Sequence, residues 1–114
     1  MQLRLLEDGA LPPALNMAVD EALLYGAKTP TLRLYGWRPH AVSLGYFQQR
    51  ADFDDLPPQT VVTRRLTGGG AIDHGDELTY SLALDAELLP VDIDASYVLL
   101  HDAVVAALTA AGVA

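Results

Sequence analysis

The sequence RRLTGGGAIDH, residues 64–74, is the stretch on which the interpretation of this chain depends. Three consecutive glycines, Gly68 to Gly70, follow the β-branched run 60–63 and precede a short apolar segment that ends in His74. Glycine loses more backbone entropy on folding than other residues, so three in a row imply a compensating role. That role is either a turn with positive φ or a surface without Cβ atoms on which a ligand or another backbone lies. The stretch predicts a ligand-binding loop between two strands.

Polar groups around the glycines indicate what the loop can bind. Arg64 and Arg65 can donate to a phosphate or a carboxylate, and on one strand they would point to opposite faces. Backbone N–H groups of residues 68–71 can converge on an anion, and His74 can serve as a polar wall. The spacing is that of neither a P-loop nor a dinucleotide fingerprint. Taken alone, the glycines suit a plain hairpin turn equally well.

Composition limits the classes of protein to consider. The 114 residues are 51% hydrophobic, which predicts a single globular domain. No apolar run approaches the roughly 18 residues of a membrane span, so no membrane contact is expected. The chain has no cysteine and three scattered histidines, which favours a cytoplasmic protein without a metal site. A net charge of −8 argues against nucleic-acid binding, whereas the arginines gathered in the middle third suit an anionic ligand.

Hydrophobic periodicity predicts an alternation of strands and helices. Strands are expected at 2–7, 31–37, 41–47, 60–66, 71–74 and 78–84, and helices at 14–25 and 96–111. A turn is expected at Asp8-Gly9, loops at 52–59 and 87–94, and a hairpin through residues 38–40. Strands in runs favour an α+β or mixed α/β fold, with a largely antiparallel sheet flanked by helices.

Four blocks of this sequence resemble the lipoate–protein ligase and octanoyltransferase family, within the biotin/lipoate protein ligase superfamily. They are NMAVDEALL at 16–24, LRLYGWRP with VSLGYFQ at 32–39 and 42–48, the glycine stretch at 64–74, and ELTYS at 77–81. The last block is similar to the octanoyltransferase branch. The resemblance implies that residues 1–114 form the N-terminal part of one catalytic domain of this superfamily.

The resemblance also implies an activity and a set of site residues. Family members attach a lipoyl or octanoyl group to a lysine of the lipoyl domains of 2-oxoacid dehydrogenases or of the glycine cleavage H protein. Ligases use ATP and Mg²⁺ as co-substrates, transferases take the acyl group from acyl carrier protein, and neither keeps a permanent cofactor. The implied acyl or adenylate site comprises Trp37, Arg65, Thr67, Gly68, Gly69, Gly70, Ala71 and His74. Arg65 would hold the phosphate or carboxyl end, and His74 would line the carbonyl side.

The reactive residues of the family have no counterpart in the chain. The only lysine, Lys28, does not match the family's lysine, which is expected beyond Ala114, and the transferase cysteine is missing. We therefore expect residues 1–114 alone to be inactive and leave the catalytic residue unknown. Two alternatives stay open: an enzyme like biotin–protein ligase, and a non-catalytic acyl-binding or accessory fragment. Ligase or transferase activity, and preference for lipoate or octanoate, are also left open.

Overall fold

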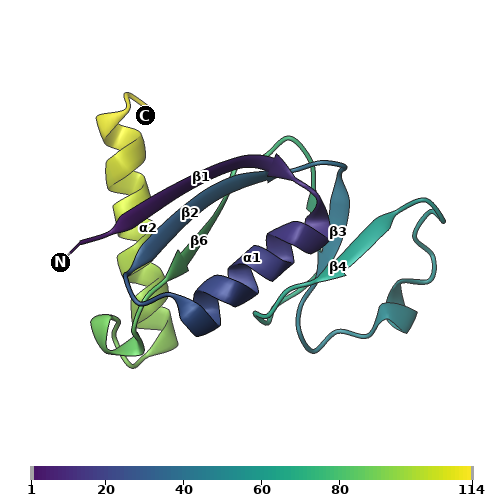
Figure 1. Ribbon diagram of the computed structural model, residues 1–114, viewed down its shortest axis with the longest axis horizontal. Coiled ribbons are helices and arrows are strands. Elements are labelled where there is room, and N and C mark those ends of the chain that lie inside the picture. Colours follow the sequence, from purple (N-terminus) through teal and green to yellow (C-terminus); the bar gives the residue numbers. More distant parts are fainter. Residues whose placement is uncertain (1, 114) are drawn as a thin grey trace. The chain divides into compact units, whose positions relative to one another are not determined.

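A computed structural model describes residues 2–113 of the chain. The chain divides into two compact units, one that reaches to Leu84 and one that begins at Asp85 (Figure 1). Within residues 2–113, the first unit holds one α-helix, one 3₁₀ turn and six strands, and the second holds a short 3₁₀ turn and a long α-helix.

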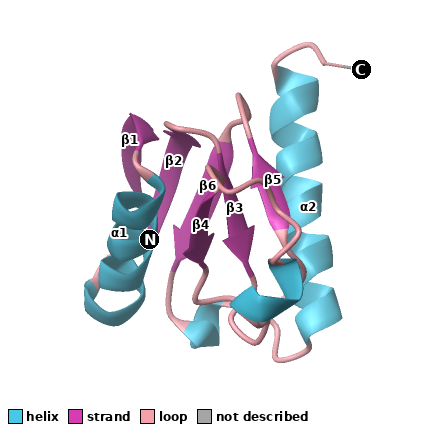
Figure 2. Ribbon diagram, turned by 90° about the vertical axis from the view of Figure 1, so that its right-hand side faces the viewer, coloured by secondary structure: helices cyan, strands magenta, loops and turns pink. Residues whose placement is uncertain are grey.

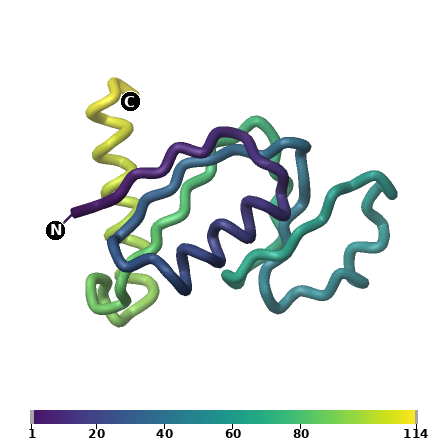
Figure 3. Tube along the Cα trace, in the orientation of Figure 1, coloured from purple at the N-terminus to yellow at the C-terminus, as the bar shows by residue number. Residues whose placement is uncertain are grey.

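The first sheet has the strand order β1-β2-β6. β1 (Arg4–Leu11) and β2 (Thr31–Trp37) are parallel, and α1 (Pro13–Gly26) connects them. A parallel pair needs such a crossover, because the chain must return to the end at which it started. β6 (Thr79–Ala83) pairs antiparallel with β2 although it lies far along the chain, and Figure 3 shows the three segments side by side.

The second sheet has the order β4-β3-β5 (Figure 2). β3 (Ala41–Leu44) runs parallel to β4 (Val61–Arg64) and antiparallel to β5 (Ile72–His74), and the 3₁₀ turn η1 (Arg50–Phe53) lies between β3 and β4. The mixed α/β class is confirmed. The strands nevertheless form two mixed sheets, each with one parallel and one antiparallel pair, in place of one largely antiparallel sheet.

Two local predictions are wrong. Residues 31–37 and 41–47 do not form a hairpin, because both edges of β2 are taken by β1 and β6 and both edges of β3 by β4 and β5. Asp8-Gly9 does not end the first strand. Gly9 has φ +68° and shifts the register, so that β1 continues to Leu11 opposite Trp37. A glycine that relieves a bulge in this way resembles a turn signal in sequence.

Helix α1 is close to its predicted span and packs on both sheets, with contacts to β2, β4 and β6. Pro13 stands at the first helical position, where its missing N–H costs no hydrogen bond. The buried core beneath the helix consists of Tyr35, Trp37 and Ala41, with Met17 of α1 packed against it. The core therefore lies where β2, β3 and the helix meet.

The second unit consists of η2 (Ala86–Leu88) and α2 (Ile93–Ala110). The Asp92 carboxylate caps α2 by accepting from the Ala95 N–H at 3.2 Å, and Gly112, with φ +86°, follows its end as predicted. By length and composition alone, α2 is long and apolar enough to cross a membrane, with a mean hydropathy of 1.4 over 18 residues. The window includes Asp94, His101 and Asp102, so it is not a continuous apolar run, and core helices of soluble proteins satisfy the same criterion.

Candidate functional site

A cavity of about 330 Å³ lies in the first unit beside α1, β2 and β6. This volume is at the lower end of the range of small-molecule sites. Four residues singled out in the sequence line it: Trp37, Arg65, Thr67 and His74. The other four, residues 68–71, are exposed and lie outside the lining. The remaining lining residues are Met17, Asp20, Leu23, Leu24, Tyr35, Leu66, Ile72 and Thr79 to Ala83.

Trp37 and His74 form one wall of the cavity. The indole and imidazole rings are stacked, with centroids 3.8 Å apart and planes 15° apart. The indole Nε1–H donates to Thr79 Oγ1 at 2.8 Å, so the buried donor has its acceptor. Both side chains are almost fully buried, which fixes the orientation of the wall.

Both ring nitrogens of His74 face protein groups. Nε2 is 2.7 Å from Ser43 Oγ, and Nδ1 is 3.2 Å from Glu77 Oε2. Both ring nitrogens of His74 are therefore engaged, and the ring has no free donor in this state. The resemblance implied that His74 lines the carbonyl side of the site. A hydrogen bond between a ring nitrogen and a ligand carbonyl would require one of these two contacts to open.

Arg65 holds the glycine loop through its side chain. Nη1 donates to the Ser43 carbonyl at 2.9 Å and to Ser43 Oγ at 2.7 Å. Nη2 donates to the carbonyls of Gly68 and Gly70 at 3.0 and 2.8 Å. Burial lowers the pKa of Arg65, but a guanidinium remains charged at neutral pH. The side chain thus supplies a fixed positive charge at the cavity.

The path of the glycine loop requires a glycine at Gly69 within the loop and another at Gly45 beside it. Gly69 has φ +93°, a conformation that other residues rarely adopt. A Cβ at Gly45 would overlap the Gly69 carbonyl oxygen, so the loop lies directly on the Gly45 backbone. A Cβ at Gly68 or Gly70 would meet open space. Both roles expected of glycine, a positive φ and a close approach of two backbones, therefore occur here. The convergence of loop N–H groups on an anion stays a prediction.

Arg64 serves a second loop. Its Nη1 donates to the carbonyls of Gly45, Tyr46 and Gln48, in the segment that follows β3. The two neighbouring arginines thus reach different loops, as expected from side-chain alternation along an extended chain. The Thr67 carbonyl accepts from the Tyr46 N–H at 2.9 Å and joins the two loops.

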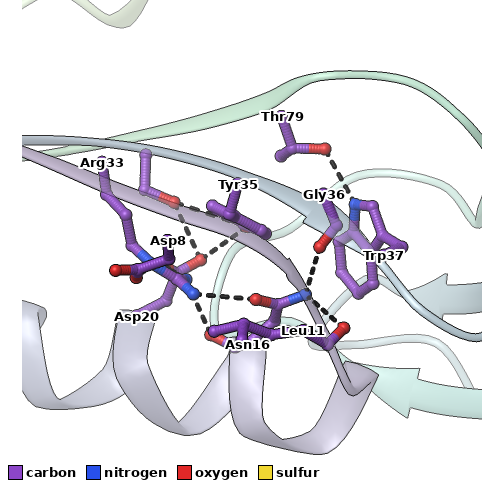
Figure 4. Close-up of polar contacts among 10 residues, drawn as sticks. Asp8, Leu11, Asn16, Asp20, Arg33, Tyr35, Gly36, Trp37 and Thr79 are labelled. Carbon is purple, nitrogen blue, oxygen red and sulfur yellow. Dashed lines mark hydrogen bonds and ion pairs between the residues drawn. The ribbon is translucent and has the colours of Figure 1, made fainter.

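A buried ionic cluster adjoins the cavity through Asp20 and Tyr35, which also line it. Figure 4 shows the polar contacts of this cluster. Arg33 is fully buried and donates to Asp8 Oδ2 at 2.6 Å, to Asp20 Oδ1 at 2.8 Å and to Asn16 Oδ1 at 2.7 Å. Its guanidinium carbon lies 3.9 Å from the centroid of the Tyr35 ring. A buried charge needs such partners to offset the loss of hydration. Arg33 therefore has a structural role and does not contribute to the anion site expected from the central arginines.

Asp20 also joins the cluster to the cavity. Its Oδ2 accepts from the Tyr35 hydroxyl at 2.9 Å and from Ser81 Oγ at 2.8 Å, and all three residues line the cavity. Burial raises the pKa of Tyr35 to about 12, with the Asp20 carboxylate acting in the same direction against the hydrogen bond from Ser81. Tyr35 is thus neutral and a donor at neutral pH.

Four residues that organise the site received no role from the sequence: Ser43, Glu77, Arg33 and Asn16. All four stand in the blocks that resemble the family, and Arg33 also alternates with Tyr35 and Trp37 on the buried face of β2. Ser43 and Glu77 come from elements that meet only in the folded chain. In residues 2–113 no three His, Asp or Glu side chains gather in a way that could hold a metal ion.

Comparison with known proteins agrees with this geometry. The family model of the lipoyl protein ligase A/B catalytic domain matches residues 12–114. The chain is 46% identical over 110 residues to an octanoyltransferase LipM from an Exiguobacterium species, with 88% of this chain and 40% of the relative covered. It is 43% identical over 119 residues to octanoyltransferase LipM of Moorella thermoacetica, with 96% and 44% covered.

Solved structures show the same fold. A Thermoplasma acidophilum lipoate protein ligase with bound lipoic acid superposes with a TM-score of 0.62 at 29% identity, over 77% of this chain and 41% of that one. A structure described as a bipartite ligase and its E2 lipoyl domain from the same organism gives 0.62 at 30% identity, over 77% and 39%. Lipoate-protein ligase A bound with ATP gives 0.57 at 30%, over 77% and 41%.

The chain spans about two fifths of the length of the curated relatives that it matches. Within that span the helix α1, the stacked wall and the glycine loop all fall inside the matched range. The chain belongs to the lipoyl protein ligase A/B catalytic domain family.

Proposed function

We propose that the protein containing this chain attaches an octanoyl or lipoyl group to a lysine of lipoyl domains. The observation that carries the proposal is the cavity beside α1, in which mainly apolar side chains adjoin the fixed charge of Arg65. An acyl chain gains about 0.8 kcal/mol for each CH₂ group that it buries. A cavity of about 330 Å³ offers such burial to one thin chain.

The proposed binding mode places the two ends of the ligand differently. The acyl tail lies along the apolar lining contributed by residues such as Leu23 and Leu82. The carboxyl, thioester or adenylate end lies toward Arg65 and Thr67, where positive charge favours developing negative charge. The open space beside Gly68 and Gly70 supports this, because a head group can approach the bare backbone there.

The relatives favour transfer over ligation. The two octanoyltransferases are 46% and 43% identical to this chain, whereas the ligase structures are 29% to 30% identical. In transfer, the bond between the acyl carbon and the carrier sulfur breaks, the amide bond to the lysine nitrogen forms, and the thiol leaves with a proton. A ligase would instead consume ATP with Mg²⁺ through an acyl-adenylate. In either case we place the reactive lysine or cysteine beyond Ala114.

The partners follow from the reaction. We propose lipoyl domains of 2-oxoacid dehydrogenases or the glycine cleavage H protein as acceptors, and acyl carrier protein as the donor. The structure of a related ligase with its E2 lipoyl domain supports the acceptor. A cytoplasmic location goes with this proposal, because these partners are metabolic enzymes and carriers.

The test uses the natural full-length protein with a purified apo lipoyl domain and mass spectrometry of the acceptor. We expect an octanoyl adduct with octanoyl acyl carrier protein and without ATP. An adduct only with free octanoate, ATP and Mg²⁺ would assign ligase activity instead. An adduct only with biotin and ATP on a biotin acceptor domain would overturn the proposal.

Variants test the site assignment. Arg65→Ala should slow transfer by at least about a hundredfold, because it removes the fixed positive charge beside the developing negative charge, and losing one such stabilising group typically costs about 10²–10³ in rate. Arg50→Ala is the matched control, because that arginine lies outside the cavity and pairs with Asp54 at the surface. If Arg65→Ala leaves both octanoate binding and transfer unchanged, the cavity is not the acyl site.

A further inference from the structure

A line of hydrogen bonds connects Glu77 to Arg65 through the stacked wall. Glu77 Oε2 is 3.2 Å from His74 Nδ1, His74 Nε2 is 2.7 Å from Ser43 Oγ, and Ser43 Oγ accepts from Arg65 Nη1 at 2.7 Å. Ser43 is fully buried and His74 is almost so. We call this line the Glu77–Arg65 relay.

Elementary hydrogen-bond rules fix the direction of the relay. A guanidinium only donates, so Ser43 Oγ accepts from Arg65. An ionised carboxylate only accepts, so His74 Nδ1 carries the proton that is shared with Glu77. A neutral imidazole has one N–H group, and its Nε2 therefore accepts from the Ser43 hydroxyl. In this arrangement each donor along the line has an acceptor.

Serine, histidine and glutamate are also the residue types of a nucleophilic triad. Two observations exclude that role for Ser43. Its side chain is fully buried, and its oxygen already accepts from the charged Arg65. The line of hydrogen bonds therefore ends at the Arg65 guanidinium. Its Nη2 donates to the carbonyls of Gly68 and Gly70.

We propose that the Glu77–Arg65 relay sets the tautomer of His74 and the position of Arg65, and through Arg65 the shape of the glycine loop. Glu77 and Ser43 are then positioning residues for the ligand site, and neither touches the ligand. Glu77 also lies 3.4 Å from Thr79 Oγ1, the acceptor of the Trp37 N–H, and accepts from the Gly75 N–H at 3.1 Å. One carboxylate therefore orients both rings of the wall. The predicted effect on ligand affinity rests on the proposed function, whereas the predicted tautomer of His74 does not.

The first measurement is made without ligand. In the ¹⁵N-labelled full-length protein, long-range ¹H–¹⁵N spectra should show His74 as the neutral Nδ1–H tautomer. Glu77→Ala should convert it to a mixture or to the Nε2–H form. Glu77→Gln should keep the Nδ1–H form, because the amide oxygen still accepts. Asp76→Asn is the matched control, since that neighbouring carboxylate is exposed and contacts His40.

The second measurement is the affinity for octanoate by calorimetry. Glu77→Ala and Ser43→Ala should weaken binding roughly tenfold, the typical size of one lost hydrogen bond to a charged group. Asp76→Asn should leave the affinity unchanged, and Glu77→Gln should stay close to the parent protein. Glu77 is partly exposed, so its variants remain informative if Ser43→Ala does not fold.

The outcomes separate the two proposals. An Nε2–H tautomer in the parent protein, or the same tautomer in Glu77→Ala as in the parent, overturns the relay. Equal loss of octanoate affinity in Asp76→Asn and Glu77→Ala also overturns it. If the parent protein transfers no acyl group to the lipoyl domain but shows the expected tautomers, the proposed function is overturned and the relay stands as a device that orders the loop.

Discussion

The Trp37 indole lies flat against the His74 imidazole, with ring centroids 3.8 Å apart. Trp37 ends β2 in the first sheet, and His74 ends β5 in the second. The stacked pair therefore joins the two sheets at the cavity. The Tyr35 ring, with its centroid 5.6 Å from that of Trp37, extends the aromatic row along β2.

Replacing Trp37 by phenylalanine should destabilise the protein. Trp37→Phe removes the N–H that donates to Thr79 Oγ1 and part of the stacking area, and we expect a loss of about 1–3 kcal/mol in the free energy of unfolding. Urea denaturation followed by circular dichroism measures it, since Trp37 is the only tryptophan and fluorescence would be lost. Tyr80→Phe, at a half-exposed ring, is the control. Equal stability of the two variants would contradict the assigned role.

Alanine substitutions should distinguish the glycines of the site. Gly45→Ala places a Cβ against the Gly69 carbonyl, so the loop must shift, at a cost of about 1–3 kcal/mol. Gly68→Ala places its Cβ in open space and should leave the thermal midpoint nearly unchanged. Thermal unfolding of both variants tests the difference. A larger loss in Gly68→Ala than in Gly45→Ala would show that the loop packs differently.

The buried ionic cluster should be sensitive to the loss of its cation. Arg33→Met leaves the carboxylates of Asp8 and Asp20 without their partner, and breaking a buried pair typically costs about 3–5 kcal/mol. Arg50→Met removes an exposed pair with Asp54 and should cost less than about 1 kcal/mol. Chemical denaturation compares the two directly. Similar losses in both variants would mean that Arg33 is not the centre of the cluster.

Alkaline pH should reveal the buried tyrosine. The pKa of Tyr35 is raised from 10.0 to about 12 in the folded chain, so folding favours the protonated phenol. This contribution to stability is complete below about pH 10 and is lost as the pH rises through about 12. Over this interval of pH, the midpoint temperature of thermal unfolding should fall more steeply for the parent protein than for Tyr35→Phe. Tyr25→Phe, at an exposed ring, should behave like the parent. Identical slopes for Tyr35→Phe and the parent would refute the shift.

Local patterns predicted most elements of the fold. The spacing of Leu15, Ala18, Val19 and Ala22 predicted α1 almost to its bounds. A β-rich run predicted β2, and alternation predicted β6. These succeed because helices and strands depend on neighbours along the chain. The strand pairings could not be read in this way. Two β-rich runs joined by residues 38–40 predicted a hairpin between β2 and β3, but each strand pairs with other strands in its own sheet.

The candidate site was likewise predictable only in part: the sequence pointed to some of its residues but not to their contacts. The sequence predicted the glycine stretch, Trp37, Arg65, Thr67 and His74 as site residues from the blocks that resemble the family. The structure places Trp37, Arg65, Thr67 and His74 in the lining of one cavity. Only the tertiary structure decided what each side chain does. Arg33 became the centre of a buried ionic cluster, and Ser43 and Glu77 became partners of His74. A charge or hydroxyl acquires its role from the partners and the burial that folding gives it, and those partners lie on segments distant in sequence.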